Sequence, residues 1–385
     1  MGEVSGRRTP EASARRVDGV DLARGLALIG MFVAHVAPVV TTEPWMALIG
    51  VADERPRLLF ALTAGIGLGL MSGARHPIPA APGRFGGPAR AELRRQIAIR
   101  AVILIAMGLA ITWFVAPLVF VILDVYGLAF LLLLPLIFVP RGVALGVGIA
   151  GVTIAPGVAV LVSRAQWIVD ARLTGWQIPV DWVFSGAYPV IEWVPVMLIG
   201  LAIARFGVTR PRVVLWSGLV GASACAVLLA PGVALLRQSV AGMADVATLD
   251  EAYLQAAVGE SLQAVGNVGI CAVVVAVAVA LTTLVAPRVA GVVRAVCSPV
   301  TAMGAMPLTI YTAHLFVIAA SVYVDDRGFR SDDSWPLLIG LVVGSMAFAW
   351  LWRRFVGRGP LEQLMRLASG RGRAERPTGD AAPTA

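Results

Sequence analysis

Long apolar runs recur along the whole chain, and each is long enough to cross a lipid bilayer. A transmembrane helix needs about 20 predominantly apolar residues. Runs of this kind are found at 20–40, 57–73, 97–116, 118–139, 142–162, 190–205, 213–235, 262–286, 300–322 and 336–353. They are continuous rather than alternating, which favours helices over the strands of a β-barrel. The sequence therefore predicts an all-α, polytopic transmembrane helix bundle of about ten spans.

The composition agrees with a membrane protein and argues against an ordinary soluble domain. Of the 385 residues, 58% are hydrophobic and only 14% are charged, whereas soluble domains have about 25% charged residues. The polar, arginine-rich N-terminus shows no short apolar segment with a cleavage site, so we expect no removable signal peptide. The cysteines Cys225, Cys271 and Cys297 show no metal or redox spacing, and no metal is expected.

The distribution of arginine sets the expected orientation. All 31 basic residues are arginines, and the net charge is +8. If the N-terminus is inside, the arginines left outside are Arg55, Arg57, Arg164, Arg172, Arg237, Arg327 and Arg330. The positive-inside rule then predicts that both termini are cytoplasmic, because the span count is even. Since topology and anionic lipid headgroups account for the charge, nucleic acid is not an expected partner.

One membrane domain is expected, at 18–368, between a cytoplasmic N-terminal segment at 1–17 and a disordered cytoplasmic tail at 369–385. The outer connections at 163–190 and 236–260 are expected to be loops, with interfacial tryptophans. Glycine patterns at 65–69 and 146–151 lie inside spans. They therefore predict close helix packing rather than nucleotide binding.

An arginine and a histidine lie at opposite ends of the segment RGLALIGMFVAH in the first apolar run. Polar residues inside spans are costly and are therefore functional candidates. Eleven residues at about 100° each place Arg24 and His35 on one helix face, with His35 about 16 Å further along the axis. The structural alternative is that Arg24 extends to the headgroups while His35 hydrogen-bonds a carbonyl of the bundle.

A second histidine lies in the segment MGAMPLTIYTAHL, near the end of the chain. His314 is expected at a depth similar to that of His35, with Tyr311 one turn away on the same side. Two imidazoles at one depth suggest a shared site, although the sequence does not show that they meet.

Two further polar groups interrupt the apolar runs. Asp124 lies near Tyr126 in VILDVYGL, and an isolated intramembrane carboxylate normally has a partner. Glu260, Gln263 and Asn267 follow helical spacing at the outer end of a span. This stripe is either a substrate-binding surface or simply a wet interface.

Several of these segments resemble known membrane proteins. The spacing of Arg24 and His35 resembles the diagnostic motif of the bacterial acyltransferase-3 family. The wider pattern is similar to the YeiB-like bacterial proteins that are grouped with the heparan-alpha-glucosaminide N-acetyltransferase catalytic domain. The likeness runs from about residue 16 to 368 and rests on DGVDLARGLALIGMFVAH, LLFALTAGIGLGLM, VILDVYGLAFLLLLPL, SGAYPVIEWVPVMLIGLAIAR, MGAMPLTIYTAHL and RGPLEQLMR.

The resemblance implies a membrane acyltransferase of the bacterial cytoplasmic membrane. The implied donor is cytoplasmic acyl-CoA, usually acetyl-CoA, and the implied acceptor is a cell-envelope glycan or lipid at the outer face. Membrane lipids are expected partners, and a homo-oligomer is compatible with this function. There is one departure: the animal N-acetyltransferases carry an essential histidine shortly before a tryptophan after the first span. This chain has Thr42 and Glu43 before Trp45 there, and no histidine.

Roles for the candidate residues follow from that resemblance and from their chemistry. The catalytic candidates are His35, His314 and Asp124: a neutral imidazole serves as general base or becomes acylated itself, and a carboxylate (Asp124 or Glu260) orients an imidazole. The candidates for binding the anionic donor are Arg24, Arg94, Arg95 and Arg100. The candidates for substrate binding are Tyr126, Glu260, Gln263, Asn267 and Tyr311.

A transporter is the alternative function. In that case the polar residues near the midplane would move a substrate or protons across the membrane. Inverted repeats or paired broken helices would favour a transporter, and neither is clear from the sequence.

Overall fold

The computed structural model describes residues 16–38, 55–324 and 328–370, and these are almost entirely helical. In chain order the helices are α1 (Asp18–Val36), α3 (Arg55–Met71), α4 (Pro88–Ala110), α5 (Leu123–Leu133), α6 (Arg141–Ser163), α7 (Gln166–Leu173), α8 (Gln177–Val180), α9 (Val190–Phe206), α10 (Pro211–Gly242), α11 (Leu249–Thr283), α12 (Pro287–Gly304), α13 (Pro307–Ala320), α14 (Trp335–Phe355) and α15 (Pro360–Ala368). Short helical turns are η2 (Arg84–Gly86), η3 (Ile111–Val115), η4 (Asp181–Ser185) and η5 (Val246–Thr248). Strands β1 (Tyr323–Val324) and β2 (Arg330–Ser331) pair antiparallel.

Two expectations fall largely outside this description. The N-terminal segment at 1–17 and the tail at 369–385 overlap the described residues only at 16–17 and 369–370. The stretch with Thr42, Glu43 and Trp45 lies outside the described residues altogether.

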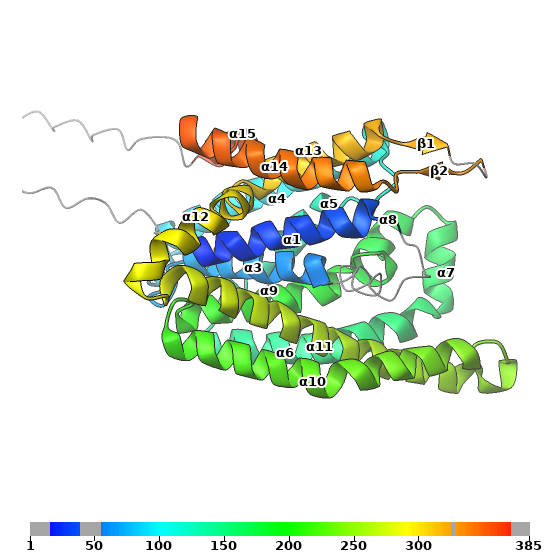
Figure 1. Cartoon of the computed structure of the whole chain (residues 1–385). Coiled ribbons are helices and arrows are strands. Elements are labelled where there is room, and N and C mark those ends of the chain that lie inside the picture. The colour runs from blue at the N-terminus through cyan, green and yellow to red at the C-terminus, as the bar shows by residue number, and fades with distance from the viewer. Residues whose placement is uncertain (1–15, 39–54, 325–327, 371–385) are drawn as a thin grey trace, which may run out of the picture.

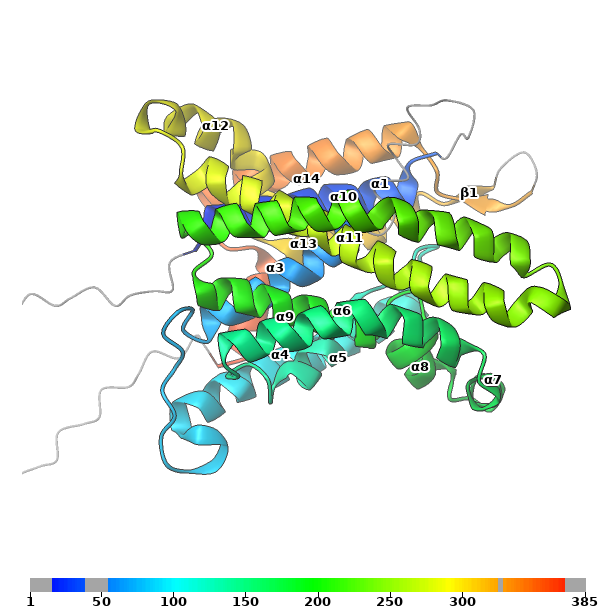
Figure 2. The same cartoon turned by 90° about the horizontal axis from the view of Figure 1, so that it is seen from below.

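The long helices run in a common direction, with α1 at the centre of the bundle (Figures 1 and 2). Helix α1 packs against α3, α11, α12, α13 and α14. Helices α10 and α11 lie side by side (Figure 2). The α7–α8 segment and the β1–β2 hairpin project at one end, whereas α15 lies towards the other (Figure 1). Short segments therefore lie at both ends of the bundle, with α7–α8 and the β1–β2 hairpin at one end and α15 towards the other.

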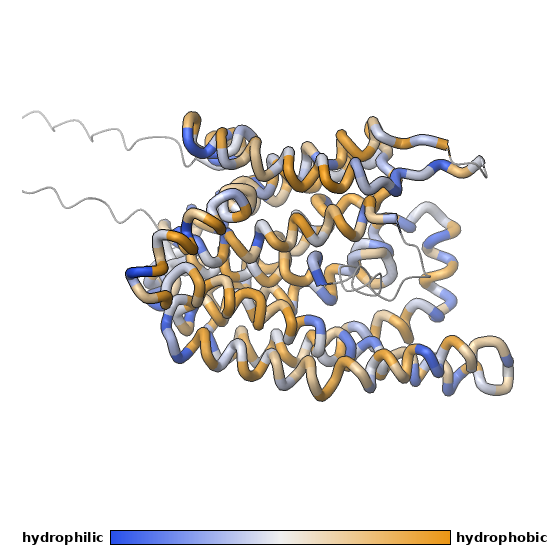
Figure 3. The backbone as a smooth tube through the Cα atoms, in the orientation of Figure 1, coloured by the Kyte–Doolittle hydropathy of each residue, from blue (hydrophilic) through white to orange (hydrophobic). Residues whose placement is uncertain are grey.

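The long helices consist mostly of apolar residues (Figure 3), and many of their large apolar side chains are exposed. On α10, for example, Leu219, Val220 and Val227 are 50%, 61% and 64% exposed. In water, so continuous an apolar surface would be an aggregation hazard, whereas lipid tails cover it at no cost. The structure therefore confirms the predicted all-α transmembrane helix bundle.

The expected count of about ten spans is not confirmed. Among the described residues, six helices are long and apolar enough to cross a membrane, or up to eight if each of two bent pairs forms one span. The run expected at 118–139 is helical only over α5, because Pro135 cannot continue a helix. The run expected at 300–322 is interrupted as well: α12 and α13 meet at 72°, and Pro307 begins α13 after the break.

The expected outer loops are more helical than predicted. Helix α10 continues to Gly242 and α11 begins at Leu249, so little of 236–260 is loop. Small residues keep these two helices together beyond the predicted spans, since a Cβ on Gly259 would lie 2.9 Å from Leu236 of α10 and one on Gly242 would lie 3.0 Å from Ala252 of α11. The connection at 163–190 contains α7, α8 and η4.

Most of the glycines predicted to allow close helix packing do so, whereas a Cβ on Gly146 would meet nothing within 4 Å. A side chain on Gly65 would overlap the backbone carbonyl of Met197 on α9, and one on Gly200 would overlap that of Leu62 on α3. Gly151, in the second glycine pattern, packs directly on Pro195 of α9. Helix α9 is thus held at backbone contact distance by glycines from α3 and α6.

Replacing Gly65 by leucine tests this close contact. Gly65→Leu places an isobutyl group where the Met197 carbonyl lies, so we expect a loss of stability of about 1–3 kcal/mol or more. The measurement is the thermal unfolding midpoint of the purified protein in detergent. Gly340→Leu is the matched control, because Gly340 lies in the long helix α14 and a Cβ there meets nothing within 4 Å. Equal unfolding midpoints for the two variants would contradict the packing argument.

Candidate functional site

The two span histidines meet, although 279 residues separate them in the chain. His35 lies in the last turn of α1, and His314 lies in α13 with only 1% of its surface exposed. The Nδ1 atom of His35 is 3.2 Å from Nε2 of His314. Their rings are stacked with centroids 5.4 Å apart and planes 8° from parallel. The structure therefore brings together the two imidazoles that the sequence placed at similar depth.

The hydrogen bonds of the pair define which nitrogens carry protons. Nδ1 of His314 bonds the backbone carbonyl of Tyr311, and a carbonyl can only accept, so this nitrogen is protonated. In a neutral His314 the lone pair is then on Nε2, where it accepts from Nδ1–H of His35. His35 is left with its own lone pair on Nε2. Of the two imidazoles, the partly exposed His35 is thus the one that offers a basic or nucleophilic nitrogen.

Arg24 lies inside the bundle rather than among headgroups. Its guanidinium donates to Oδ1 of Asp21 at 3.1 Å, to the carbonyl of Gly304 at 3.3 Å and to the carbonyl of Thr63 at 3.2 Å. These acceptors come from α1, α12 and α3. Gly304 packs directly on the α1 backbone at Asp21, which brings its carbonyl within reach. The alternative in which Arg24 extends to the lipid surface is therefore wrong.

Charged side chains hydrogen-bond the backbone groups that are left without helical partners on both sides of the break between α12 and α13. On the α12 side, Arg24 and Arg16 donate to the carbonyls of Gly304 and Ala305. On the α13 side, Glu362 of α15 accepts from the backbone N–H groups of Leu308 and Thr309 at 2.7 and 3.1 Å. This arrangement follows the helix dipole, with cations at a C-terminus and an anion at an N-terminus. A helix that would otherwise expose unpaired backbone groups in the membrane is thereby stabilised.

A cavity of about 770 Å³ lies beside this break, between α1, α3, α4, α5, α13 and α15. Its charged lining consists of Arg16, Arg24, Arg100, Arg358, Arg366 and Glu362. Its apolar and aromatic lining includes Phe60, Leu104, Leu123, Tyr126, Phe130 and Tyr311. We call this space the arginine cavity. Burial, and then Arg366 and Arg16, lower the pKa of Arg358, as expected for guanidinium groups gathered around one space.

Tyr311 connects the arginine cavity to the histidine pair. Its side chain lines the cavity, and its hydroxyl accepts from the backbone N–H of Ile122 at 3.0 Å. Its backbone carbonyl accepts from His314, whose ring lies 4.8 Å from the phenol ring. A molecule in the cavity would therefore contact the residue that fixes the tautomer of His314.

The predicted donor-binding residues divide into two groups. Arg24 and Arg100 line the arginine cavity. Arg94 instead donates to the carbonyl of Leu134, and Arg95 pairs with Glu92 at 2.8 Å on an exposed face of α4. Neither Arg94 nor Arg95 is among the residues that line the cavity.

Asp124 has a partner, but that partner is not an imidazole. Its carboxylate accepts from the indole N–H of Trp182 at 2.9 Å and from the backbone N–H of Val125 at 2.8 Å. It lines a separate pocket of about 390 Å³ together with Gln177 and Asp181. The expectation that an intramembrane carboxylate has a partner is confirmed, whereas the suggestion that Asp124 orients a histidine finds no contact among the described residues.

The predicted stripe on α11 does not reach the arginine cavity. Glu260 lines another pocket, of about 250 Å³, with Arg57 and Glu192. Asn267 accepts from Arg55 at 3.0 Å. Gln263 lies between them on the same helix. Of the predicted substrate-binding residues, only Tyr126 and Tyr311 line the arginine cavity.

Sequence reasoning missed four charged residues of the site, namely Arg16, Arg358, Glu362 and Arg366. Of the arginines, Arg16, Arg358 and Arg366 were counted only as signals of topology. The available signal was the segment RGPLEQLMR, in which a proline begins a short helix and Glu362 and Arg366 share one face at i, i+4 spacing. In the described part of the chain, no group of three or more His, Cys, Asp or Glu is arranged to hold a metal ion.

Comparison with known proteins identifies the family to which the chain belongs. Residues 16–232 match the heparan-alpha-glucosaminide N-acetyltransferase catalytic domain, and residues 209–371 match a family described as a protein of unknown function, DUF418. No curated protein matches the chain. These matches do not test the acyltransferase-3 spacing of Arg24 and His35, which stays a resemblance. The first match spans more than half of the sequence, and the chain therefore belongs to the heparan-alpha-glucosaminide N-acetyltransferase catalytic-domain family.

Proposed function

We propose that this protein is a membrane enzyme that transfers an acyl group, most simply acetyl, from cytoplasmic acyl-CoA to an acceptor at the opposite face. The acceptor class is a cell-envelope glycan or lipid, and the location is the cytoplasmic membrane of a bacterium. Family membership supports a membrane acetyltransferase-like function. The observation that carries the proposal is the arginine cavity, which Tyr311 joins to a hydrogen-bonded histidine pair.

The arginine cavity has the chemistry that an acyl-CoA donor requires. Coenzyme A carries phosphate groups at one end and a thioester on a flexible arm at the other. Guanidinium groups bind phosphate through paired, charge-assisted hydrogen bonds, and five arginines line this cavity. The aromatic lining that includes Tyr126 and Tyr311 suits the uncharged thioester arm. We therefore assign donor binding to Arg24 and Arg100, joined by Arg16, Arg358 and Arg366.

The histidine pair supplies two routes for the transfer. In the first, Nε2 of His35 takes the proton of an acceptor hydroxyl or amine, which attacks the thioester carbonyl as the carbon–sulfur bond breaks. The thiolate then leaves and takes up the proton. In the second, Nε2 itself attacks the thioester carbonyl, the carbon–sulfur bond breaks and the thiolate leaves. The acceptor then attacks the acyl group on Nε2, the nitrogen–acyl bond breaks to return the neutral imidazole, and the proton lost by the acceptor goes to the thiolate. In both routes His314 holds the ring of His35 in place through the Nδ1–H bond.

A transporter remains the second candidate, because the part of the chain that the structure describes contains two bent helix pairs, at 46° and 72°. Broken helices are typical of transporters, where their free ends bind substrate or ions. At the 72° break, however, Arg16, Arg24 and Glu362 already bind the helix ends. Backbone groups satisfied by the chain itself are not open to an ion, so this break supports a transporter less than its bend suggests.

Donor binding can be tested by comparing two arginines on α4. We expect Arg100→Gln to weaken acetyl-CoA binding about 10- to 100-fold, because a charge-assisted hydrogen bond is worth about 1.5–3 kcal/mol. The measurement is isothermal titration calorimetry of the purified protein with acetyl-CoA. Arg95→Gln is the matched control, since Arg95 lies on the same helix but pairs with Glu92 away from the cavity. Equal affinities for the two variants, or no binding to the wild type, would contradict the proposed donor site.

The roles of the histidines can be tested by replacing them one at a time. We expect His35→Ala to lower acyl transfer or acetyl-CoA hydrolysis about 10²- to 10⁴-fold, the usual contribution of a general base. His314→Ala removes the partner of His35 and is expected to lower the rate by less. Both variants should retain acetyl-CoA affinity, because neither imidazole lines the arginine cavity. His76→Ala is the control, since His76 lies exposed in a loop.

Two outcomes would contradict this assignment. One is a His35→Ala protein that transfers the acyl group at the wild-type rate. The other is a wild-type protein that moves a labelled metabolite into liposomes without cleaving any thioester, which would favour the transporter.

A further inference from the structure

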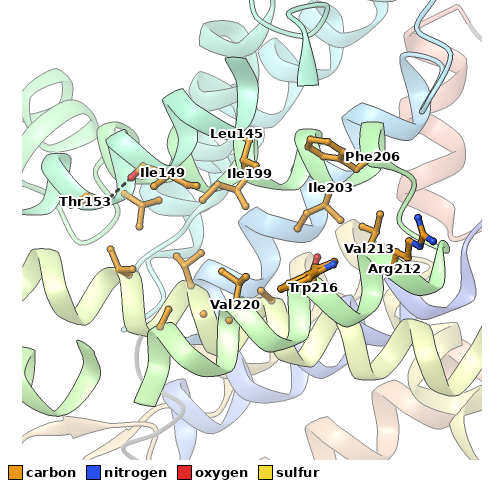
Figure 4. A pocket seen from close by; sticks show the side chains of 18 residues that line it. Leu145, Ile149, Thr153, Ile199, Ile203, Phe206, Arg212, Val213, Trp216 and Val220 are labelled. Carbon is orange, nitrogen blue, oxygen red and sulfur yellow. Dashed lines mark hydrogen bonds between the residues drawn. The ribbon is translucent and has the colours of Figure 1, made fainter. Parts of the chain in front are cut away.

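A second cavity, of about 410 Å³, is lined almost wholly by apolar residues, and Arg212 is the one charged residue in its lining. It is lined by residues of α6 and α9 on one side and of α10 and α11 on the other. Figure 4 shows the two walls facing each other, with Leu145, Ile199 and Phe206 opposite Val213, Trp216 and Val220. The volume falls within the roughly 300–1,000 Å³ that is usual for small-molecule sites. We call this space the α10 groove.

The walls of the α10 groove are two tightly packed helix pairs. Gly148 of α6 packs against Ile199 of α9, and Gly221 of α10 packs against Gly269 of α11, each so closely that no Cβ would fit. The glycine contacts hold the two helices of each pair against each other. Side chains of neither pair fill the space between the pairs. Helix α10 packs mainly on α11 and makes few contacts with α9.

Both ends of the groove are closed by the chain. At the outer end α6 meets α11, where the backbone N–H of Gly157 donates to Oγ of Ser261 at 3.2 Å. At the other end the short connection from Phe206 to Pro211 joins α9 to α10. The groove is therefore a trough that the chain bounds at both ends, and it is open to lipid along its length, where Trp216 and Val220 are 63% and 61% exposed.

A cation lies at one end of this trough. Arg212 lines the groove next to Val213, in the first turn of α10 (Figure 4). Within residues 16–38, 55–324 and 328–370, its guanidinium has no hydrogen-bond or ion-pair partner. Arg141 lies close by, with its guanidinium 4.9 Å from the ring centre of Phe206. By the arginine distribution this is the cytoplasmic end, where anionic headgroups are abundant.

We propose that the α10 groove binds one acyl chain of an anionic phospholipid of the cytoplasmic leaflet, whose phosphate binds Arg212. Apart from Arg212, the lining offers few polar groups, namely the hydroxyls of Thr153 and Ser217 and the indole of Trp216, and the Thr153 hydroxyl already donates to the carbonyl of Ile149 in its own helix. The lining therefore suits an apolar occupant. An apolar chain needs no hydrogen bonds, and only its headgroup requires a cation. This site is separate from the arginine cavity and does not depend on the proposed acyl transfer.

The bound lipid would join the α10–α11 pair to the α6–α9 pair. The stability of the bundle should then depend on the charge of the bound lipid. The contribution of the headgroup and that of the acyl chain should be separable. An anionic lipid supplies both groups, a zwitterionic lipid supplies the chain with a weaker headgroup contact, and glycerol 3-phosphate supplies the phosphate alone.

The test is native mass spectrometry of the full-length protein in detergent, titrated with dioleoyl phosphatidylglycerol, dioleoyl phosphatidylcholine or glycerol 3-phosphate. We expect the wild type to retain phosphatidylglycerol preferentially and glycerol 3-phosphate not at all. Arg212→Gln should weaken phosphatidylglycerol binding about fivefold, the usual worth of one arginine near a membrane surface, and should weaken phosphatidylcholine binding less, because its headgroup contact is already weaker. Arg288→Gln is the matched control, because Arg288 also follows the proline that begins its helix and does not line the groove.

A second pair of variants tests the acyl-chain position. Val220→Trp fills the groove and should reduce the binding of both lipids, whereas Val227→Trp should not. Both valines are similarly exposed on α10, and only Val220 lines the groove. Two binding results would overturn the proposal: phosphatidylglycerol binding that Arg212→Gln leaves at the wild-type level, or lipid binding that Val220→Trp does not reduce. A wild-type dimer without bound lipid would also overturn it, because a second copy of the chain would then cover the groove.

Discussion

The Arg24 guanidinium is a cation placed among apolar helices, and a membrane bundle tolerates it only if the chain supplies acceptors. Asp21 supplies a carboxylate from the same helix, and Thr63 and Gly304 supply carbonyls from two others. Three helices are thereby fixed around one charge. The Gly304 carbonyl is available because α12 ends there, so the break in the helix and the burial of the arginine depend on each other.

That break determines the shape of the arginine cavity. Helix α13 leaves α12 at 72°, and its first turn is held by Glu362 of α15. A continuous helix would occupy the space beside α1 and would direct Tyr311 elsewhere. Because α13 turns, Tyr311 lines the cavity on one side and accepts from His314 through its carbonyl on the other. The cation and the imidazoles are thus linked by one helix rather than by direct contact.

Features that depend on neighbouring residues could be predicted from the sequence, whereas contacts between residues far apart in the chain could not. The apolar runs, and the common face of Arg24 and His35, depend on local periodicity and were predictable. Pro135 and Pro307 mark positions where a continuous helix must be interrupted. Only the three-dimensional structure shows which backbone carbonyls the break between α12 and α13 leaves unpaired. The contact between His35 and His314 joins residues 279 positions apart. Equal depth made it plausible, but neighbouring helices cannot be identified from hydropathy. Asp124 shows the opposite limit, since its partner, Trp182, comes from a segment expected to be loop.

The two family matches describe parts of one site. The first covers Arg24, His35 and Arg100, and the second covers His314, Arg358 and Glu362. His35 and His314 share a hydrogen bond, and the arginines of both parts line a single cavity. Neither part could form the site alone, because Glu362 holds the first turn of α13 while Arg24 holds the end of α12. This mutual dependence favours a single membrane domain over two joined units, and it makes any change that loosens α15 a change at the histidine pair as well.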